Sequence, residues 1–304
     1  PAPRRSSGVR LPPPAAVLAF RDRRHRPPMQ TAWTLDEIDW NAFEPRRVDP
    51  VQLAAVKAAA LVEFNADDYV AYLERVFAGE AEALTLIRQW GDDERRHGMA
   101  LARWGALADP AFDFQSAMAR FRAGYRIHPD AVASVRGSRA GEMIARCIVE
   151  CGTSSFYSSL RDASGEPVLR QVAARIARDE FHHYRLFHAL YLRYAATDRI
   201  GLLRRLGIAL GRISEADDDE LAYAWWSANL APTGQVYDRT ACFRAQQKAA
   251  LSGYRREHVR RAVHMIARAV GLRPDGHFAR AATSLAWWRL RGRGAGASPS
   301  APSH

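Results

Sequence analysis

Two Glu-x-x-His motifs, each preceded by a glutamate at nearly the same distance, constrain this chain more than any other feature. Glu63 lies 31 residues before Glu94, and Glu150 lies 30 residues before Glu180. Residues three apart on an α-helix share a face. Each motif can therefore present both of its side chains to the same neighbour, and the pattern predicts that four consecutive helices converge. The two motifs are Glu94-Arg95-Arg96-His97 and Glu180-Phe181-His182-His183.

Capping and breaking residues place the helices that carry these motifs. Asp49-Pro50 is typical of a helix start, with Asp as the N-cap and Pro in the first turn. Glu166-Pro167 opens another helix in the same way, and Gly79 and Asp109-Pro110 interrupt the helical pattern. The four long helices are expected at about residues 50–77, 80–108, 139–162 and 167–196.

Shorter helices are expected around these four, and no segment alternates as a strand with hairpin signals. Ser214 and Asp217 resemble a capping pair for a helix that runs through Trp225-Trp226. The fold class predicted is all-α, a ferritin-like four-helix bundle with additional C-terminal helices. The other short helices are expected at residues 113–125, 199–213, 238–252 and 255–270.

Composition divides the chain into three parts. Residues 1–30 are rich in Pro and Arg and are expected to form a disordered basic tail. Residues 31–275 form the predicted helical domain, with the core bundle at about 50–200 and the extra helices at about 214–275. The sequence from Gly292 is rich in Gly, Ser, Pro and Ala, and residues 276–304 are predicted to be a flexible C-terminal tail.

The order Glu, Glu-x-x-His, Glu, Glu-x-x-His is the ligand set of di-iron and di-manganese carboxylate bundles. Glu150 lies in an apolar stretch, residues 143–151, that only Arg146 interrupts, and an unpaired carboxylate there would be costly to bury. Two ferrous ions would balance the four negative charges. Oxygen and imidazole donors suit iron or manganese, so two Fe ions are expected, with Mn as the alternative. The predicted metal ligands are Glu63, Glu94, His97, Glu150, Glu180 and His183.

Each of these residues also has an ordinary interpretation. Helical Glu and His are usually exposed, and a lone His on an apolar face is usually only hydrogen-bonded, so the prediction depends on the six as a set. Asp67, one turn after Glu63 on the same face, could replace it as the ligand. His182 and His188 are interpreted as packing residues or as contacts behind the ligands.

At the motifs the sequence resembles the soluble acyl-carrier-protein desaturase family. That family has one signature close to Glu-Glu-Asn-Arg-His-Gly, a second close to Asp-Glu-Lys-Arg-His, and a Glu-x-x-Thr on the third bundle helix. Trp90, before the first signature, also fits, and the resemblance covers about residues 50–200. The corresponding segments are Asp93-Glu94-Arg95-Arg96-His97-Gly98, Asp179-Glu180-Phe181-His182-His183 and Glu150-Cys151-Gly152-Thr153.

The resemblance implies that Thr153 lies on the oxygen-binding side of the metals and that Asp179 orients His97 from behind. It also implies an O2-dependent di-iron oxidase that desaturates or hydroxylates an aliphatic acyl chain. No flavin or nicotinamide motif is visible, so an external electron donor such as a ferredoxin is expected. Two alternatives remain open: a ferroxidase that handles iron without an organic substrate, and an RNA-modifying hydroxylase.

The net charge of +11 resides in the two ends of the chain. Residues 1–30 carry +6 and residues 255–304 carry +8, which leaves −3 for residues 31–254. Basic ends could bind an acidic acyl-carrier protein, whereas the acidic body disfavours nucleic acid as a partner. Three cysteines without a disulfide or zinc spacing, and no apolar run long enough for a membrane span, favour a cytoplasmic protein. A homodimer is compatible with the sequence.

Overall fold

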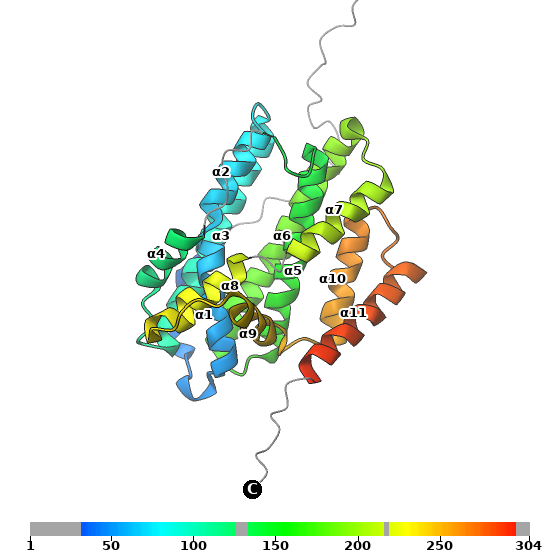
Figure 1. The fold of residues 1–304 in the computed structure, drawn as a ribbon. Coiled ribbons are helices and arrows are strands. Elements are labelled where there is room, and N and C mark those ends of the chain that lie inside the picture. Colours follow the sequence, from blue (N-terminus) through cyan, green and yellow to red (C-terminus); the bar gives the residue numbers. More distant parts are fainter. Residues whose placement is uncertain (1–31, 126–132, 216–218, 296–304) are drawn as a thin grey trace, which may run out of the picture.

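The computed structural model describes residues 32–125, 133–215 and 219–295 (Figure 1). These residues form helices joined by turns and loops, with no strand among them, so the predicted all-α helical bundle is confirmed. The basic segment 1–30 lies outside the described residues. No helix in the described part of the chain combines the length and apolarity needed to cross a bilayer.

Five helices make the bundle, because the first predicted helix is divided in two. α5 begins beside the end of α2, where the Arg139 guanidinium donates hydrogen bonds to the carbonyl oxygens of Val76 and Ala78, each at 3.0 Å. α3 and α5 therefore run in the same direction, and a long crossover containing α4, Phe114–Gly124, connects them (Figure 1). The bundle helices are α1 Pro50–Phe64, α2 Ala66–Val76, α3 Ala81–Ala108, α5 Arg139–Ala163 and α6 Pro167–Asp198.

The residues predicted to start helices, Asp49 and Glu166, act as N-caps of α1 and α6. The Asp49 carboxylate accepts hydrogen bonds from the backbone N–H groups of Val51 and Gln52, at 2.7 and 3.0 Å. At α6, the Glu166 carboxylate accepts a bond from the Leu169 N–H, 2.7 Å, and another from the Trp104 indole, 2.7 Å. The α6 cap thus also joins α3 and α6 in the core.

The helix predicted for residues 50–77 is interrupted at Asn65, where ψ is 15°. Sequence gives little sign of this, because no Gly or Pro stands between Gly79 and Pro50. The break lies where α1 meets α3: a β-carbon on Gly98 would come within 2.6 Å of the Phe64 backbone nitrogen. The Asn65 side chain is buried and accepts a bond from Arg122 on α4 at 3.3 Å. Tertiary contacts at this point therefore end α1 one residue after Glu63.

The C-terminal helices cover one side of the bundle (Figure 1). α7 and α10 contact α5, α8 contacts α1, and α9 packs on α8. Ser214 does not cap α8, because its hydroxyl bonds back to the Leu210 carbonyl within α7 at 3.0 Å, and Asp217 lies outside the described residues. Short η turns precede α1 at Leu35–Glu37, Trp40–Ala42 and Pro45–Arg47. The covering elements are α7 Leu202–Ser214, α8 Asp219–Trp225, the π-helical turn η6 Trp226–Leu230, the 3-10 turn η7 Ala231–Thr233, α9 Arg239–Leu251 and α10 Arg256–Ala269.

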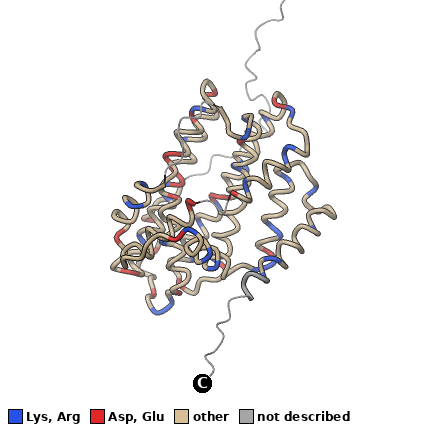
Figure 2. Tube along the Cα trace, viewed as in Figure 1, with Lys and Arg blue, Asp and Glu red and all other residues tan. Residues whose placement is uncertain are grey.

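Part of the predicted C-terminal tail is helical. α11, His277–Ala295, packs against α10 and also contacts α9, and its residues Ala279 and Thr283 are buried. Its thin apolar contact explains why composition suggested a tail from residue 276. Figure 2 shows basic segments recurring along α10 and α11, where Glu257 and Asp275 are the acidic residues among 256–295. Residues 296–304 lie outside the described part of the chain.

Two buried apolar clusters fill the bundle, one toward each end, and the motif residues lie between them. On α3 the first cluster stops at Trp90 and the second resumes at Ala100; on α6 the boundary falls between Ala177 and Tyr184. The middle of the bundle is therefore available for polar side chains held by two packed ends. Prominent members are Leu73, Ile87, Ile144, Phe187 and Leu190 in the first cluster, and Val56, Leu101, Trp104, Val172 and Ile176 in the second.

We expect Gly98→Ala to destabilise the protein by about 1–3 kcal/mol, because the added methyl group overlaps the Phe64 backbone and forces α1 away from α3. Gly207→Ala is the matched control: it lies mid-helix in exposed α7 with no atom within 4 Å of the added carbon. That change should stabilise by about 0.5–1 kcal/mol. Urea denaturation of both variants tests this, and equal midpoints would contradict the close approach.

Candidate metal centre

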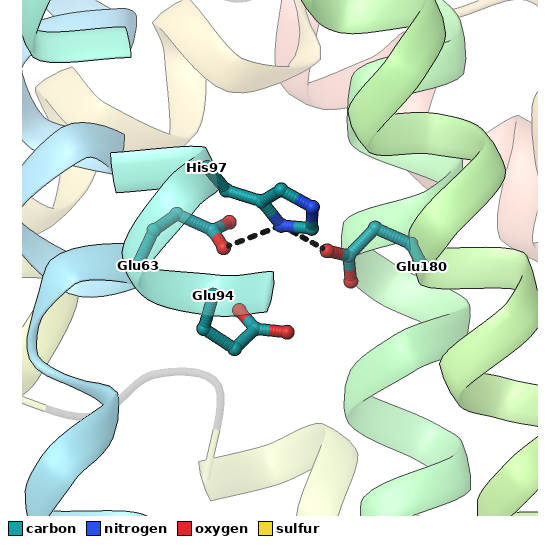
Figure 3. A group of neighbouring side chains, drawn as sticks. All are labelled: Glu63, Glu94, His97 and Glu180. Carbon is teal, nitrogen blue, oxygen red and sulfur yellow. Dashed lines mark ion pairs between the residues drawn. The ribbon is translucent and has the colours of Figure 1, made fainter. Parts of the chain in front are cut away.

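The six predicted ligand residues come together in the polar gap between the two apolar clusters. Glu63 is in the last turn of α1, Glu94 and His97 are on α3, Glu150 is on α5, and Glu180 and His183 are on α6. All six side chains are buried. Figure 3 shows Glu63, Glu94, His97 and Glu180 pointing toward one another from three of these helices.

The six residues form two overlapping groups that could each hold a metal ion. In each group, one ligand atom from every residue lies within 4.8 Å of the others. Glu94 and Glu180 belong to both groups, so these two carboxylates lie between the two positions. One group is Glu63, Glu94, His97 and Glu180; the other is Glu94, Glu150, Glu180 and His183.

Both histidines point the same ring nitrogen inward. Nδ1 of His97 lies 3.1 Å from a Glu180 oxygen and 3.6 Å from a Glu63 oxygen. Nδ1 of His183 lies 3.1 Å from a Glu94 oxygen and 3.6 Å from a Glu150 oxygen. The two Nδ1 atoms are therefore the imidazole donors that face the carboxylates.

The outward nitrogens are held by aspartates in a reciprocal arrangement. Nε2 of His97 is 3.0 Å from the Asp179 carboxylate, and Nε2 of His183 is 3.2 Å from the Asp93 carboxylate. Each aspartate immediately precedes the glutamate of one motif and contacts the histidine of the other. A carboxylate on the distal nitrogen fixes the ring and favours Nδ1 as the free donor. The role predicted for Asp179 has this geometry, whereas Asp93 was missed although it repeats the same Asp-Glu pair.

Two aromatic side chains that the sequence did not single out also contact the centre. The Trp33 indole donates a hydrogen bond of 2.7 Å to Asp179 and stacks on His97 with ring centroids 6.2 Å apart. The Tyr157 hydroxyl donates to Glu63 at 2.5 Å. Trp33 belongs to the aromatic segment before α1, whose Trp and Phe content was the available signal.

Burial and mutual repulsion raise the pKa values of two carboxylates in the cluster, those of Glu94 and Glu180. Burial, together with the charges of Glu180 and Glu63, raises the pKa of Glu94 well above its ordinary value. Burial and the charges of Glu63 and Glu150 raise the pKa of Glu180 to about 8. Burial opposes ionisation of Glu63 too, but contacts with His97 hold its pKa below the usual value. Without a cation, the cluster must retain protons.

The pKa values of the two histidines are raised and those of the two aspartates are lowered, so both kinds of group favour their charged forms. Burial disfavours the imidazolium, yet the hydrogen bond with Asp179 and the nearby carboxylates of Glu180 and Glu63 raise the pKa of His97 well above its ordinary value. The pKa of His183 is raised in the same way, by Asp93 and the carboxylates around it. Burial opposes ionisation of Asp179, but the hydrogen bond with His97 lowers its pKa to about 2. The aspartates are thus the permanent anions behind the cluster.

Unsatisfied atoms make the strongest case for a bound metal. Each of the six residues has one side-chain atom that is sealed from solvent and makes no hydrogen bond. Such atoms are rare in folded proteins because each one is costly. Six of them facing one point are explained together by cations that accept their lone pairs. The atoms are Glu63 Oε2, Glu94 Oε1, His97 Nδ1, Glu150 Oε2, Glu180 Oε1 and His183 Nδ1.

The residues considered beside the six ligands in the sequence analysis lie outside the two metal-capable groups. The Asp67 side chain is 55% exposed and pairs with Arg95, so Glu63, not Asp67, belongs to the cluster. His188 stacks on Tyr184 with centroids 5.8 Å apart, and His182 is half-buried outside both metal-capable groups. Both histidines fit the packing interpretation.

Thr153 lies at the edge of the centre. Its hydroxyl donates to the Glu180 carboxylate and also lies near the carbonyl oxygens of Val149, 3.3 Å, and Glu150, 3.4 Å. The helical back-bond and the contact with a cluster carboxylate therefore coexist. A hydroxyl so placed can hold a proton beside Glu180.

A cavity of about 410 Å³ lies against one side of the cluster. Glu63, Glu94 and Thr153 line it at the cluster end, and most of the remaining wall is apolar. Helices α1 and α5 form one wall and the C-terminal helices the other. The size is that of a pocket for a small organic molecule. Apolar lining residues include Ala59, Val62, Val149, Phe156, Ala262 and Ile266.

A scan against protein-family models and a search of curated proteins return no match for this chain. An all-helical bundle with a buried carboxylate–histidine cluster able to hold metal is compatible with the ferritin-like di-iron fold.

We expect Glu180→Ala to remove more metal than Glu150→Ala. Glu180 belongs to both groups, so its loss leaves each with three ligands, whereas the loss of Glu150 leaves the group that contains His97 complete. His188→Ala, outside both groups, should retain the full content. Metal analysis by mass spectrometry of protein from iron-replete cells gives the result, and equal metal in all variants would refute the assignment.

Proposed function

We propose that this protein is an O2-dependent di-iron oxidase that desaturates or hydroxylates an aliphatic substrate. The observation that carries the proposal is the apolar cavity that ends at Glu63, Glu94 and Thr153. Iron storage requires no such space, whereas oxidation of a C–H bond requires that an apolar chain lie against the metals with water excluded. The carboxylate and imidazole donors fit iron or manganese.

The six ligand residues would hold two iron ions, whose positive charge would balance that of the four carboxylates. Bound iron supplies the ability to reduce O2 and to oxidise an unactivated C–H bond. The chain supplies the rest: Asp93 and Asp179 keep the imidazoles oriented, Tyr157 holds Glu63, and Thr153 holds a proton beside Glu180. The apolar wall positions the chain and excludes water.

The electron count requires a partner. Reduction of O2 to water uses four electrons, and either desaturation or hydroxylation of the substrate provides two. The other two, with two protons, come from an external donor. A small ferredoxin is the class of donor we propose, and the exposed arginines along α10 and α11 offer an acidic protein complementary charge.

The direct test supplies iron-loaded protein with a chemical reductant, O2 and straight-chain fatty acids and acyl thioesters. Oxygen uptake that depends on one of these substrates, with an alkene or alcohol detected by mass spectrometry, is the expected result. Rapid oxidation of ferrous iron with no product from any substrate would instead support the ferroxidase alternative.

Thr153→Val should distinguish oxidation of an organic substrate from oxidation of ferrous iron alone. The variant keeps the side-chain shape and removes the hydroxyl that contacts Glu180. We expect unchanged iron content, a loss of product of about tenfold or more, and release of hydrogen peroxide in its place. Peroxide is measured with a peroxidase-coupled dye. Normal product yield in the variant would remove the hydroxyl from the mechanism.

Ala59→Leu should fill the cavity near the cluster. Ala59 lies one turn before Glu63 and lines the cavity, so the larger side chain displaces substrate without removing a ligand. We expect normal iron content and a preference for shorter substrates. Ala241→Leu, at an exposed position of α9, is the control and should leave the chain-length profile unaltered. An unchanged profile in Ala59→Leu would show that the substrate lies elsewhere.

A further inference from the structure

Arg146 is a buried cation that the metal centre does not use. It lies on α5 one turn before Glu150, with 7% of its side chain exposed, and it lines the cavity that ends at the cluster. Arginine is rarely buried to this extent unless acceptors surround it. Its surroundings therefore decide whether it is structural or serves a ligand.

The hydrogen bonds that a structural arginine would make are missing. Nε is sealed from solvent and makes no hydrogen bond, and no hydrogen bond from the guanidinium to an acceptor occurs among the described residues. Its charged neighbour is Glu142, 3.9 Å from Nε, whose other oxygen already accepts bonds from Tyr72 and Ser134. The faces of Tyr69 and Trp90 lie 4.8 and 6.0 Å from the guanidinium carbon. Aromatic rings position the cation but satisfy none of its N–H donors.

The other charged groups on this part of the cavity wall have partners. Both Glu215 oxygens accept bonds from Arg136, and a Glu220 oxygen accepts a bond from the Tyr69 hydroxyl at 2.9 Å. Arg146 differs from these two groups in that its side chain makes no hydrogen bond within the described residues. The cavity has an apolar wall, a metal-binding end and, on α5 next to that end, a guanidinium with open hydrogen-bonding capacity.

We propose that Arg146 binds the carboxylate of a free organic acid whose apolar part occupies the cavity. A guanidinium matches a carboxylate with two parallel N–H···O bonds, a geometry that neither an ester nor an amide reproduces. This inference rests on the proposed function, since it names the substrate class of the same site. It favours a free acid over an acyl group on a carrier protein, because the thioester has no carboxylate to offer.

The placement also limits which carbons react. Arg146 and Glu150 are separated by one helical turn, so an anchored carboxylate and the metal-binding end lie on adjacent parts of the same wall. A short or folded acid would present to the metal-binding end the carbons that lie close to its own carboxylate. A long extended chain would have to turn within the cavity.

Binding is measured first, without turnover. Isothermal titration calorimetry of the purified, metal-containing protein uses octanoate, decanoate and phenylpropionate, each compared with its neutral primary amide. We expect at least one acid to bind about 10- to 100-fold more tightly than its amide. Arg146→Gln should abolish the preference, and Arg146→Lys should retain part of it. Arg289→Gln, which removes a charge from exposed α11, should bind as the unaltered protein does.

Thermal unfolding distinguishes a ligand-binding arginine from a structural one. Arg146→Gln loses no hydrogen bond, and Glu142, its ion-pair partner at 3.9 Å, keeps the bonds from Tyr72 and Ser134, so the melting temperature should change little. If the glutamine variant does not fold, the lysine variant supplies the comparison. A lowered melting temperature with an unchanged acid preference overturns the proposal, and so does the failure of every acid in the panel to bind better than its amide.

The two proposals can fail separately. An acid that binds through Arg146 while the iron-loaded protein consumes no O2 refutes the oxidase and leaves the carboxylate site. Substrate-dependent O2 consumption with equal use of acids and amides, unaffected by Arg146→Gln, refutes the carboxylate site and leaves the oxidase.

Discussion

Four carboxylates buried within a few ångströms of one another are the constraint on which the rest of this structure depends. Such a group cannot remain fully ionised in a bundle core without cations, and burial together with the charges of neighbouring glutamates raises the pKa values of Glu94 and Glu180. The apolar clusters on either side keep the bundle helices at fixed spacing. The fold thus holds in place side chains that would separate if the helices were free to move.

The groups behind the cluster limit its rearrangement. Each motif contributes an aspartate to the histidine of the other motif, so α3 and α6 hold one another's ligands in orientation. Trp33 and Tyr157 extend this support to the segment before α1 and to α5. Preorganisation of this kind matters because ligands that are already oriented lose little entropy when a metal binds.

Motif spacing and helix caps were sufficient to predict the all-helical class, three of the four long helices and the residues that meet. Asp49-Pro50 and Glu166-Pro167 act locally, so sequence reveals them. The break at Asn65 arises from the contact of α1 with α3 at Gly98, and α11 depends on packing against α10; neither has a strong local signal. Asp93, Tyr157 and Trp33 were missed because their roles depend on which side chains face each other across helices, which spacing along one helix does not specify.

Two sets of helices bound the cavity, and only one of them carries residues of the cluster. α1, α3 and α5 carry ligands, so few changes on their inner faces leave the metal centre intact. The wall contributed by α7 to α10 carries none of the six cluster residues. Substitutions there alter the shape of the cavity without disturbing the cluster. The molecule that fits the cavity can therefore change while the six cluster residues stay the same.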